Sequence, residues 1–234
     1  MTYLNSANSV QSNSRPETVM SLIDLSPSMD YEDWSPSRLA GAIKANLKLM
    51  EIKARQHPKD KMGLIGFWGK ASILHSPVSP ATHLKGLQKA LENASGDGGT
   101  NFTAALELAE ECLLDRPGSS SSGFLSRILT DIFCETNQSR YTKADAGSMK
   151  RIILLTDGDH NQGGSPISTA NRLKNAGVII DCIGIGGSPD DVNEKLLKRI
   201  ASQNPDDSAR YWFIGDQEKL IKTYETLARH IQVI

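Results

Sequence analysis

The sequence predicts an α/β fold with a mostly parallel central sheet, helices on both faces and one antiparallel edge strand. Residues 18–23 (TVMSLI) and 151–155 (RIILL) are short, densely apolar runs, which is the pattern of strands buried on both faces. Stretches with apolar residues three and four positions apart follow each run, as in amphipathic helices. Because strands that alternate with helices build parallel sheets, this alternation predicts the fold class.

The other elements follow from the same patterns. Apolar residues from Leu39 to Ala54 share one helical face, with Ser37 as a candidate N-cap. Residues 61–68 and 71–74 are apolar and are separated only by Gly69-Lys70, so they predict a hairpin that supplies the antiparallel edge strand. Further helices are predicted at residues 84–94, from 102 onward, and at 165–176, 191–201 and 217–231, and further strands at 178–185 and 211–214.

The chain of 234 residues fits a single domain. Residues 1–16 are polar and rich in Ser and Asn, and predict a flexible N-terminal tail, so the domain is expected to span residues 17–234. Residues 117–148 interrupt the pattern with a Pro-Gly pair, a run of serines and a polar tract, and are interpreted as an irregular insertion. Long irregular segments in compact domains are often functional, which makes this one a candidate contact for a partner.

Composition excludes several function classes. Lys and Arg total 26 and Asp and Glu total 27, a formal net charge of −1, so the chain lacks the positive excess typical of nucleic-acid binding. No run approaches the roughly 18 apolar residues of a membrane-spanning helix, and no basic segment followed by an apolar stretch indicates a secretory signal. Cys112, Cys134 and Cys182 are odd in number and favour buried thiols in a reducing compartment. We therefore expect a cytoplasmic protein that contacts neither nucleic acid nor membrane.

Side chains with oxygen atoms follow both apolar runs. Asp24, Ser26 and Ser28 come directly after the first run, and alternate residues of an extended segment point the same way, so they can face one point. Thr100 ends a glycine-rich loop (SGDGGT), and Asp157 follows the second run. In a parallel sheet these segments meet at one edge. Two carboxylates and three hydroxyls, with no His or Cys, favour Mg²⁺ or Mn²⁺ over Zn²⁺.

These five residues resemble the metal-ion-dependent adhesion site (MIDAS) of the von Willebrand factor type A family. Asp24, Ser26 and Ser28 match its D-x-S-x-S motif, Thr100 matches the threonine of its second loop, and Asp157 matches the aspartate of its third. The order of strands and helices agrees with that family from about residue 18 to the end of the chain. The resemblance implies a Rossmann-like sheet and a resident divalent cation.

The resemblance also implies a role for each residue. Ser26 and Ser28 would bind the metal directly, Thr100 directly or through water, and Asp24 and Asp157 largely through water. The cation then keeps an open position, which a Glu or Asp of a partner protein can fill. The implied function is a metal-dependent protein–protein interaction module and not an enzyme. If the protein is bacterial, as a domain without a signal suggests, similar domains work beside ATPases, kinases or phosphatases.

Two alternatives remain open. A structural subunit could use the metal only to stabilise its loops. A phosphoryl-transfer enzyme could use Asp24 as nucleophile and Mg²⁺ as electrophile, although the motif offers hydroxyls where a second acid and a positioned lysine would be expected. Asp and Ser also form turns and helix caps without any ligand.

Several neighbours of the motif are ambiguous. His160 could lean over the site or be an exposed loop residue, and Trp34 could contact a partner or pack in the core. Asp97 and Asp159 are interpreted as turn formers. The glycines at 184, 186 and 187 follow a strand but lack the spacing of a nucleotide-binding loop.

Overall fold

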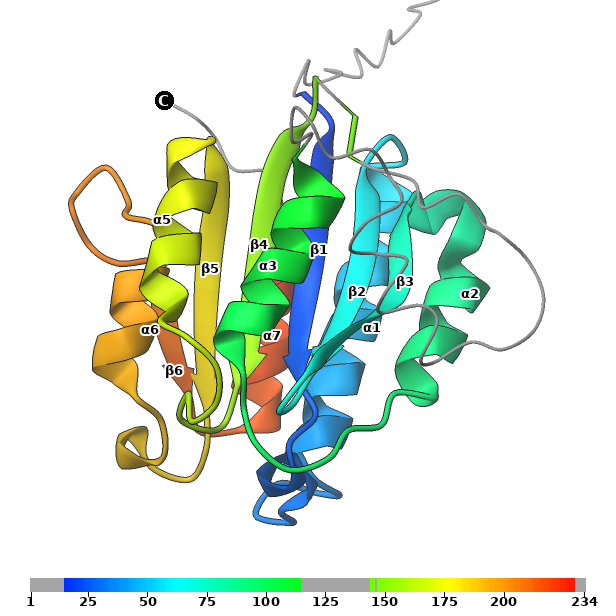
Figure 1. Cartoon of the computed structure of the whole chain (residues 1–234). Helices are drawn as coiled ribbons and strands as arrows, with labels where there is room; N and C mark the ends of the chain where they lie inside the picture. Colours follow the sequence, from blue (N-terminus) through cyan, green and yellow to red (C-terminus); the bar gives the residue numbers. More distant parts are fainter. Residues whose placement is uncertain (1–14, 115–143, 146, 230–234) are drawn as a thin grey trace, which may run out of the picture.

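The computed structural model describes residues 15–114, 144–145 and 147–229. Within these residues six strands form one sheet in the order β3-β2-β1-β4-β5-β6 (Figure 1). All neighbours pair in parallel except β2 and β3, which pair antiparallel and place β3 at one edge. The strands span Glu17–Asp24 (β1), Lys61–Phe67 (β2), Ala71–Val78 (β3), Met149–Thr156 (β4), Val178–Ile185 (β5) and Tyr211–Ile214 (β6).

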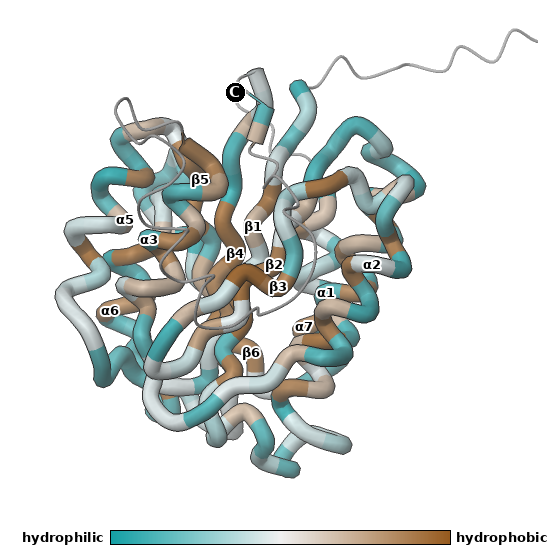
Figure 2. Tube along the Cα trace, turned by 45° about the vertical axis from the view of Figure 1, so that its right-hand side comes forward, coloured by the Kyte–Doolittle hydropathy of each residue, from teal (hydrophilic) through white to brown (hydrophobic). Residues whose placement is uncertain are grey.

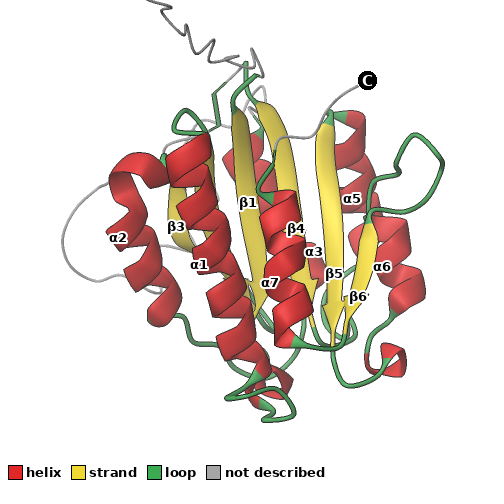
Figure 3. Cartoon of the chain, turned by 180° about the vertical axis from the view of Figure 1, so that it is seen from behind, coloured by secondary structure: helices red, strands yellow, loops and turns green. Residues whose placement is uncertain are grey.

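Helices cover both faces of the sheet. One face carries α1 (Arg38–Gln56), α2 (Pro80–Glu92) and α7 (Gln217–Leu227), which stand in front in Figure 3. The other carries α3 (Phe102–Leu113), α5 (Pro166–Asn175) and α6 (Glu194–Ile200). Two short 3₁₀ turns, η1 (Pro27–Asp30) and η2 (Pro189–Asp191), follow β1 and β5.

Two hydrophobic cores lie between the sheet and these helix layers. Successive residues of a strand point to opposite faces, so Val19 and Ile23 of β1 pack under α1 and α7, whereas Met20 and Leu22 pack under α3 and α5. All four are fully buried. Figure 2 shows hydrophobic residues in the central strands and hydrophilic ones in the outer loops. Burial on both faces explains why β1 and β4 are densely apolar.

The predicted fold class and the antiparallel edge strand are confirmed, but several element ends are wrong. Helix α2 begins at Pro80 instead of residue 84, because proline suits the first helical turn and a kink at His83 hides the periodicity. Strand β3 continues past Leu74 to Val78, and its Pro77 is tolerated at a sheet edge. The helix predicted at 191–201 is a 3₁₀ turn, η2, followed by α6. Helix α7 ends at Leu227 within the described residues.

Other predictions fall outside the described residues. These are the tail up to residue 14, most of the proposed insertion at 117–148, Cys134, and the chain from residue 230 onward. Cys182 is a free thiol buried in β5, as predicted, and Cys112 is buried in α3. None of the described helices is both long and apolar enough to cross a membrane.

Candidate metal site

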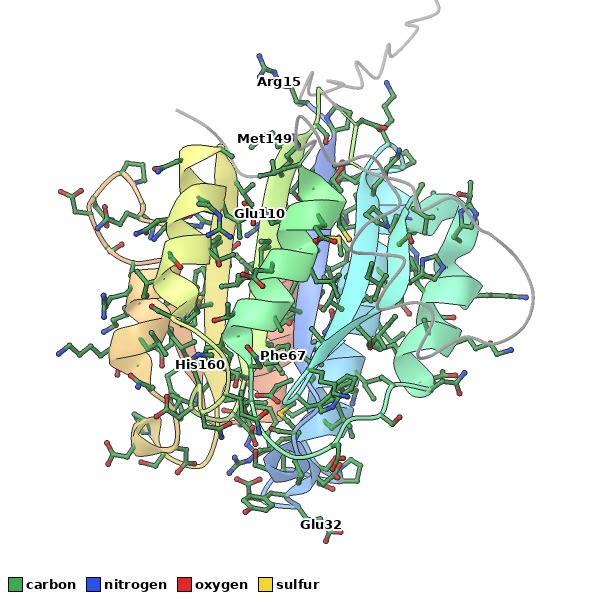
Figure 4. The ribbon with its side chains drawn as sticks, viewed as in Figure 1. Arg15, Glu32, Phe67, Glu110, Met149 and His160 are labelled. Carbon is green, nitrogen blue, oxygen red and sulfur yellow. The ribbon has the colours of Figure 1, made fainter. Side chains whose placement is uncertain are left out.

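The candidate site lies where β1 and β4 end side by side. The two strands pair in parallel up to Ile23 and Leu155, so Asp24, one residue later in β1, and Asp157, directly after β4, emerge at the same edge. Thr100 reaches this edge from the loop before α3. In Figure 4 Glu32 and His160 mark this end of the molecule, and Met149 marks the opposite end. The parallel topology therefore brings the three predicted segments together.

Asp24 is fully buried and both of its carboxylate oxygens accept hydrogen bonds. The backbone N–H of Ser26 donates to Oδ1 at 2.9 Å, and Thr156 Oγ1 donates to Oδ2 at 2.5 Å. Burial raises the pKa of Asp24 to about 6, against the opposing effect of these hydrogen bonds. Asp24 thus also acts as a turn former, as Asp often does, because its hydrogen bond from the Ser26 N–H closes a local turn. The same bonds fix the carboxylate at the strand end.

Ser26, Ser28 and Asp157 form a continuous hydrogen-bonded chain. Ser28 Oγ donates to Asp157 Oδ1 at 2.8 Å, and the two serine hydroxyl oxygens lie 3.2 Å apart. Because Ser28 uses its single hydroxyl proton on Asp157, its oxygen can act toward Ser26 only as an acceptor. The expectation of an extended segment is wrong beyond Ser26, since η1 turns the chain at Pro27–Asp30. The turn still brings both hydroxyls beside Asp157.

Thr100 is held by the loop that follows β4. Its N–H donates to Asn161 Oδ1 at 2.9 Å, and its carbonyl accepts from the N–H groups of Asn161 and Gln162. A Cβ on Gly158 would lie 3.8 Å from Thr100 Oγ1, which places the hydroxyl next to the residue after Asp157. Gly99 has a φ of 88°, a backbone conformation that glycine adopts readily and other residues rarely adopt.

Arg38, which sequence reasoning missed, lies against this site. Its Nη1 donates to Asp157 Oδ2 at 3.0 Å, and its Nε and Nη2 donate to Asp33 at 2.9 and 2.7 Å. Nη2 also lies 3.5 Å from Asp191 Oδ2. Arg38 is the first residue of α1, a position where the helix dipole disfavours a positive charge. That unfavourable position was the one signal in the sequence that Arg38 pairs with acidic groups.

The ambiguous neighbours now have assigned places. His160 stacks on Phe102, accepts from the Phe102 N–H at 3.1 Å through Nδ1, and pairs through Nε2 with the Gly164 carbonyl at 2.8 Å. It therefore links a loop to α3 and does not lean over the site. Trp34 packs in the core at 4% exposure. Asp97 bonds the N–H of Gly98 as a turn former, and Asp159 accepts from Asn193.

The donor set fits a small hard cation. It consists of two buried carboxylates and three hydroxyls, and oxygen ligands of this kind suit Mg²⁺ and Mn²⁺. In the part of the chain that the structure describes, no three His, Cys, Asp or Glu side chains are gathered as they would be around a metal. Any cation at this edge would therefore depend on the serine and threonine hydroxyls as well as on Asp24 and Asp157.

Comparison with known proteins identifies the fold. The family model for the von Willebrand factor type A domain matches residues 18–226. The uncharacterized protein YfbK of Escherichia coli K12 is 27% identical over 184 residues, covering 77% of this chain and 26% of that protein. A UPF0353 protein of a Mycobacterium species (strain KMS) is 27% identical over 234 residues, covering 91% of this chain and 60% of that protein. The chain thus spans only part of the curated relatives it matches.

A solved structure shows the same fold. Proximal thread matrix protein 1 from the mussel byssus, described with a zinc-occupied MIDAS motif, superimposes with a TM-score of 0.64 at 17% identity. The match covers 92% of this chain and 47% of that one. Together with the family model over residues 18–226, these matches agree with the sheet order and with the antiparallel edge strand. The chain belongs to the von Willebrand factor type A domain family.

Proposed function

We propose that this domain is a metal-dependent protein-binding module. A divalent cation would be held by Asp24, Ser26, Ser28, Thr100 and Asp157, and an acidic side chain of a partner protein would complete its coordination. Domains of this family often mediate protein interactions, which supports the general role. We propose in addition the identity of the metal, its five ligands and the acidic nature of the partner.

The observation that carries the proposal is the hydrogen-bonded chain from Ser26 through Ser28 to Asp157, which lies beside the buried Asp24. Two adjacent buried carboxylates are costly unless positive charge compensates both. Arg38 pairs with Asp157, whereas Ser26 and Thr156, which donate to Asp24, are neutral. A cation among the hydroxyls would supply the remaining counter-charge. If the neutral hydroxyls contact the metal directly and the carboxylates act largely through water, the metal stays electrophilic and attracts an external carboxylate.

The contacts of Asp24 support binding over phosphoryl transfer. A nucleophilic aspartate must present an accessible oxygen to the substrate. Asp24 is fully buried, and its two oxygens are engaged by Ser26 and Thr156. This arrangement suits a residue that holds the site together. The competing hypothesis is a structural subunit whose metal only stabilises the loops. It predicts that partner binding does not depend on the metal.

We propose Mg²⁺ or Mn²⁺ as the resident cation because every candidate ligand is a hard oxygen donor. The zinc-occupied MIDAS of the mussel protein shows that zinc can occupy such a motif in a relative, so Zn²⁺ belongs in every titration. We also propose a bacterial cytoplasmic setting beside an ATPase, kinase or phosphatase system, and the relatives from Escherichia coli and Mycobacterium support the bacterial part.

Calorimetry tests the metal. Wild type should bind Mg²⁺ or Mn²⁺ with a stoichiometry of about one, as expected for a single site, and the double variant Ser26→Ala, Ser28→Ala should not. Ser76→Ala, which removes a hydroxyl from the edge strand β3, is the control and should bind as wild type does. Equal binding by wild type and the double variant would place the cation elsewhere.

Affinity capture from the native lysate tests the partner. The arms are wild type in Mg²⁺, wild type in EDTA and the double serine variant in Mg²⁺, with captured proteins identified by mass spectrometry. A protein retained only by metal-loaded wild type supports the proposal, and replacing its acidic residues one at a time should then abolish capture. A protein retained in all three arms would leave the metal with a structural role.

A further inference from the structure

We propose that Arg38 is the internal counter-charge that sets the cation affinity of the candidate site, holding that affinity below what Asp24 and Asp157 alone would give. The inference rests on the proposed function, since it concerns the same site. It assigns a role to a residue outside the five motif positions.

Arg38 connects three loops at this edge of the sheet. It donates to Asp33 in the loop after β1 and to Asp157 after β4, and it lies 3.5 Å from Asp191 in η2. Asp191 is itself fixed, because its Oδ2 accepts from the N–H groups of Gly187 and Ser188. Within the described residues, the guanidinium is thus the cation shared by all three loops.

The two oxygens of Asp157 have different partners. Oδ1 accepts from Ser28 and faces the candidate ligands, whereas Oδ2 accepts from Arg38. Arg38 therefore contacts the carboxylate on the oxygen that the serines do not use. A cation bound among the hydroxyls and the guanidinium can share Asp157 without competing for one position. Their charges then repel each other across that carboxylate.

Burial decides which of these charges matters most. The side chain of Asp157 has no exposed surface and that of Arg38 is 8% exposed, whereas those of Asp33 and Asp191 are 35% and 36% exposed. Water screens the two exposed carboxylates, but it screens the Arg38–Asp157 pair poorly. The charge of Arg38 therefore acts mainly on the buried part of the site, where it offsets one of the two carboxylates.

If the role of Arg38 were purely structural, removing it would change the cation affinity in the opposite direction. If Arg38 only positioned Asp157, removing it would disorder the site and weaken cation binding. As a counter-charge, its removal strengthens binding, because the cation then meets two uncompensated carboxylates. The variant Asp33→Asn further distinguishes a counter-charge role of Arg38 from a structural role. It leaves the Arg38 charge without its exposed partner, so a counter-charge predicts weaker cation binding in Asp33→Asn and tighter binding in Arg38→Gln.

The experiment is calorimetric titration of Mg²⁺ and Mn²⁺ into wild type and variants, after circular dichroism has shown that each variant is folded. Arg38→Gln should bind on the order of tenfold more tightly than wild type, Arg38→Lys should stay near wild type because it keeps the charge, and Asp33→Asn should bind more weakly. Arg172→Gln removes an arginine that pairs with Glu110 on α3 and is the matched control, with unchanged affinity.

The outcomes separate this inference from the proposed function. Wild-type binding that weakens in both Arg38→Gln and Arg38→Lys would overturn the role of Arg38 and leave the metal site standing. Absence of cation binding in wild type and in every variant would overturn both. If Arg38→Gln does not fold, the comparison of Arg38→Lys with Asp33→Asn decides, since only a counter-charge predicts near-normal binding in the first and weaker binding in the second.

Discussion

The hydroxyl of Thr156, the last residue of β4, donates a 2.5 Å hydrogen bond to the carboxylate of Asp24, the last residue of β1. This bond ties the ends of two adjacent central strands at the point where the candidate ligands begin. Thr156 Oγ1 also accepts from the N–H of Gly158 at 3.1 Å. One side chain thus fixes the entry of both motif loops.

Thr156→Val should destabilise the domain by about 1–3 kcal/mol, because Asp24 loses a donor at a position that water does not reach. Thr156→Ser keeps the hydroxyl and should recover most of that loss. Urea denaturation in EDTA measures both changes in the free energy of unfolding. A Thr156→Val variant as stable as wild type would show that the bond contributes nothing.

The stability of the metal-free domain should depend on pH through Asp24. Its pKa rises from 3.8 in a model peptide to about 6 in the folded state, mainly through burial. Between these values the folded state binds more protons than the unfolded state, so this group makes the domain less stable as pH rises from about 4 to 6. The shift corresponds to about 3 kcal/mol.

Asp24→Asn isolates this contribution from the other carboxyl groups. Asp33, for example, has its pKa lowered by Arg38 and changes stability in the opposite direction. In EDTA, wild type should therefore lose stability relative to Asp24→Asn between about pH 4 and 6. Denaturant titrations of the two proteins at each pH measure the difference. A difference that stays constant with pH would contradict the raised pKa.

The opposite end of the sheet contains a cluster of buried charged side chains, and breaking it should lower the free energy of unfolding. Lys53 has no exposed side-chain surface and pairs with Glu17 and with Asp60, the latter at 2.7 Å. Lys53→Met should cost about 3–5 kcal/mol, because it leaves two buried carboxylates without their shared cation. Urea denaturation measures this change in the free energy of unfolding.

Lys48→Met is the matched control on the same helix. Lys48 pairs with Glu225 at 3.3 Å, and both side chains are more than one third exposed, so the loss should be about 1 kcal/mol or less. Equal losses in Lys53→Met and Lys48→Met would show that burial of the Lys53 cluster is unimportant.

The sheet could be predicted from the sequence because its central strands are buried on both faces. Residues 19–23 of β1 are apolar except for Ser21, and residues 152–155 of β4 are all apolar. Such a run marks a strand without knowledge of its neighbours. The ends of the helices were harder to predict. The first turn of α2 follows Pro80 and departs from helical geometry at His83, so the apolar periodicity starts one turn late. Local backbone geometry of this kind leaves no periodic signal.

The five motif positions could be predicted because parallel strands end at one edge. The contact of Arg38 with Asp157 could not, because it joins residues 119 positions apart, and the place of Arg38 at the start of a helix indicates an acidic partner without saying which one. The turn at η1 was also missed, since an extended segment and a 3₁₀ turn both bring Ser26 and Ser28 together. Motif spacing predicts the candidate ligands, but only the fold shows which charges surround them.

Cation binding should stabilise the folded domain, and by more at pH 7.5 than at pH 5. Burial raises the pKa of Asp24 to about 6, so near pH 5 part of the population carries a proton on Asp24 that the cation must displace. At a free Mg²⁺ concentration 100 times the Kd, the stabilisation is about 2.7 kcal/mol. Thermal melts with Mg²⁺ and with EDTA at both pH values measure it. In Asp24→Asn the gain from Mg²⁺ should be smaller and should change less with pH, and an equal gain in wild type and in the double serine variant would show that the cation stabilises the domain from another site.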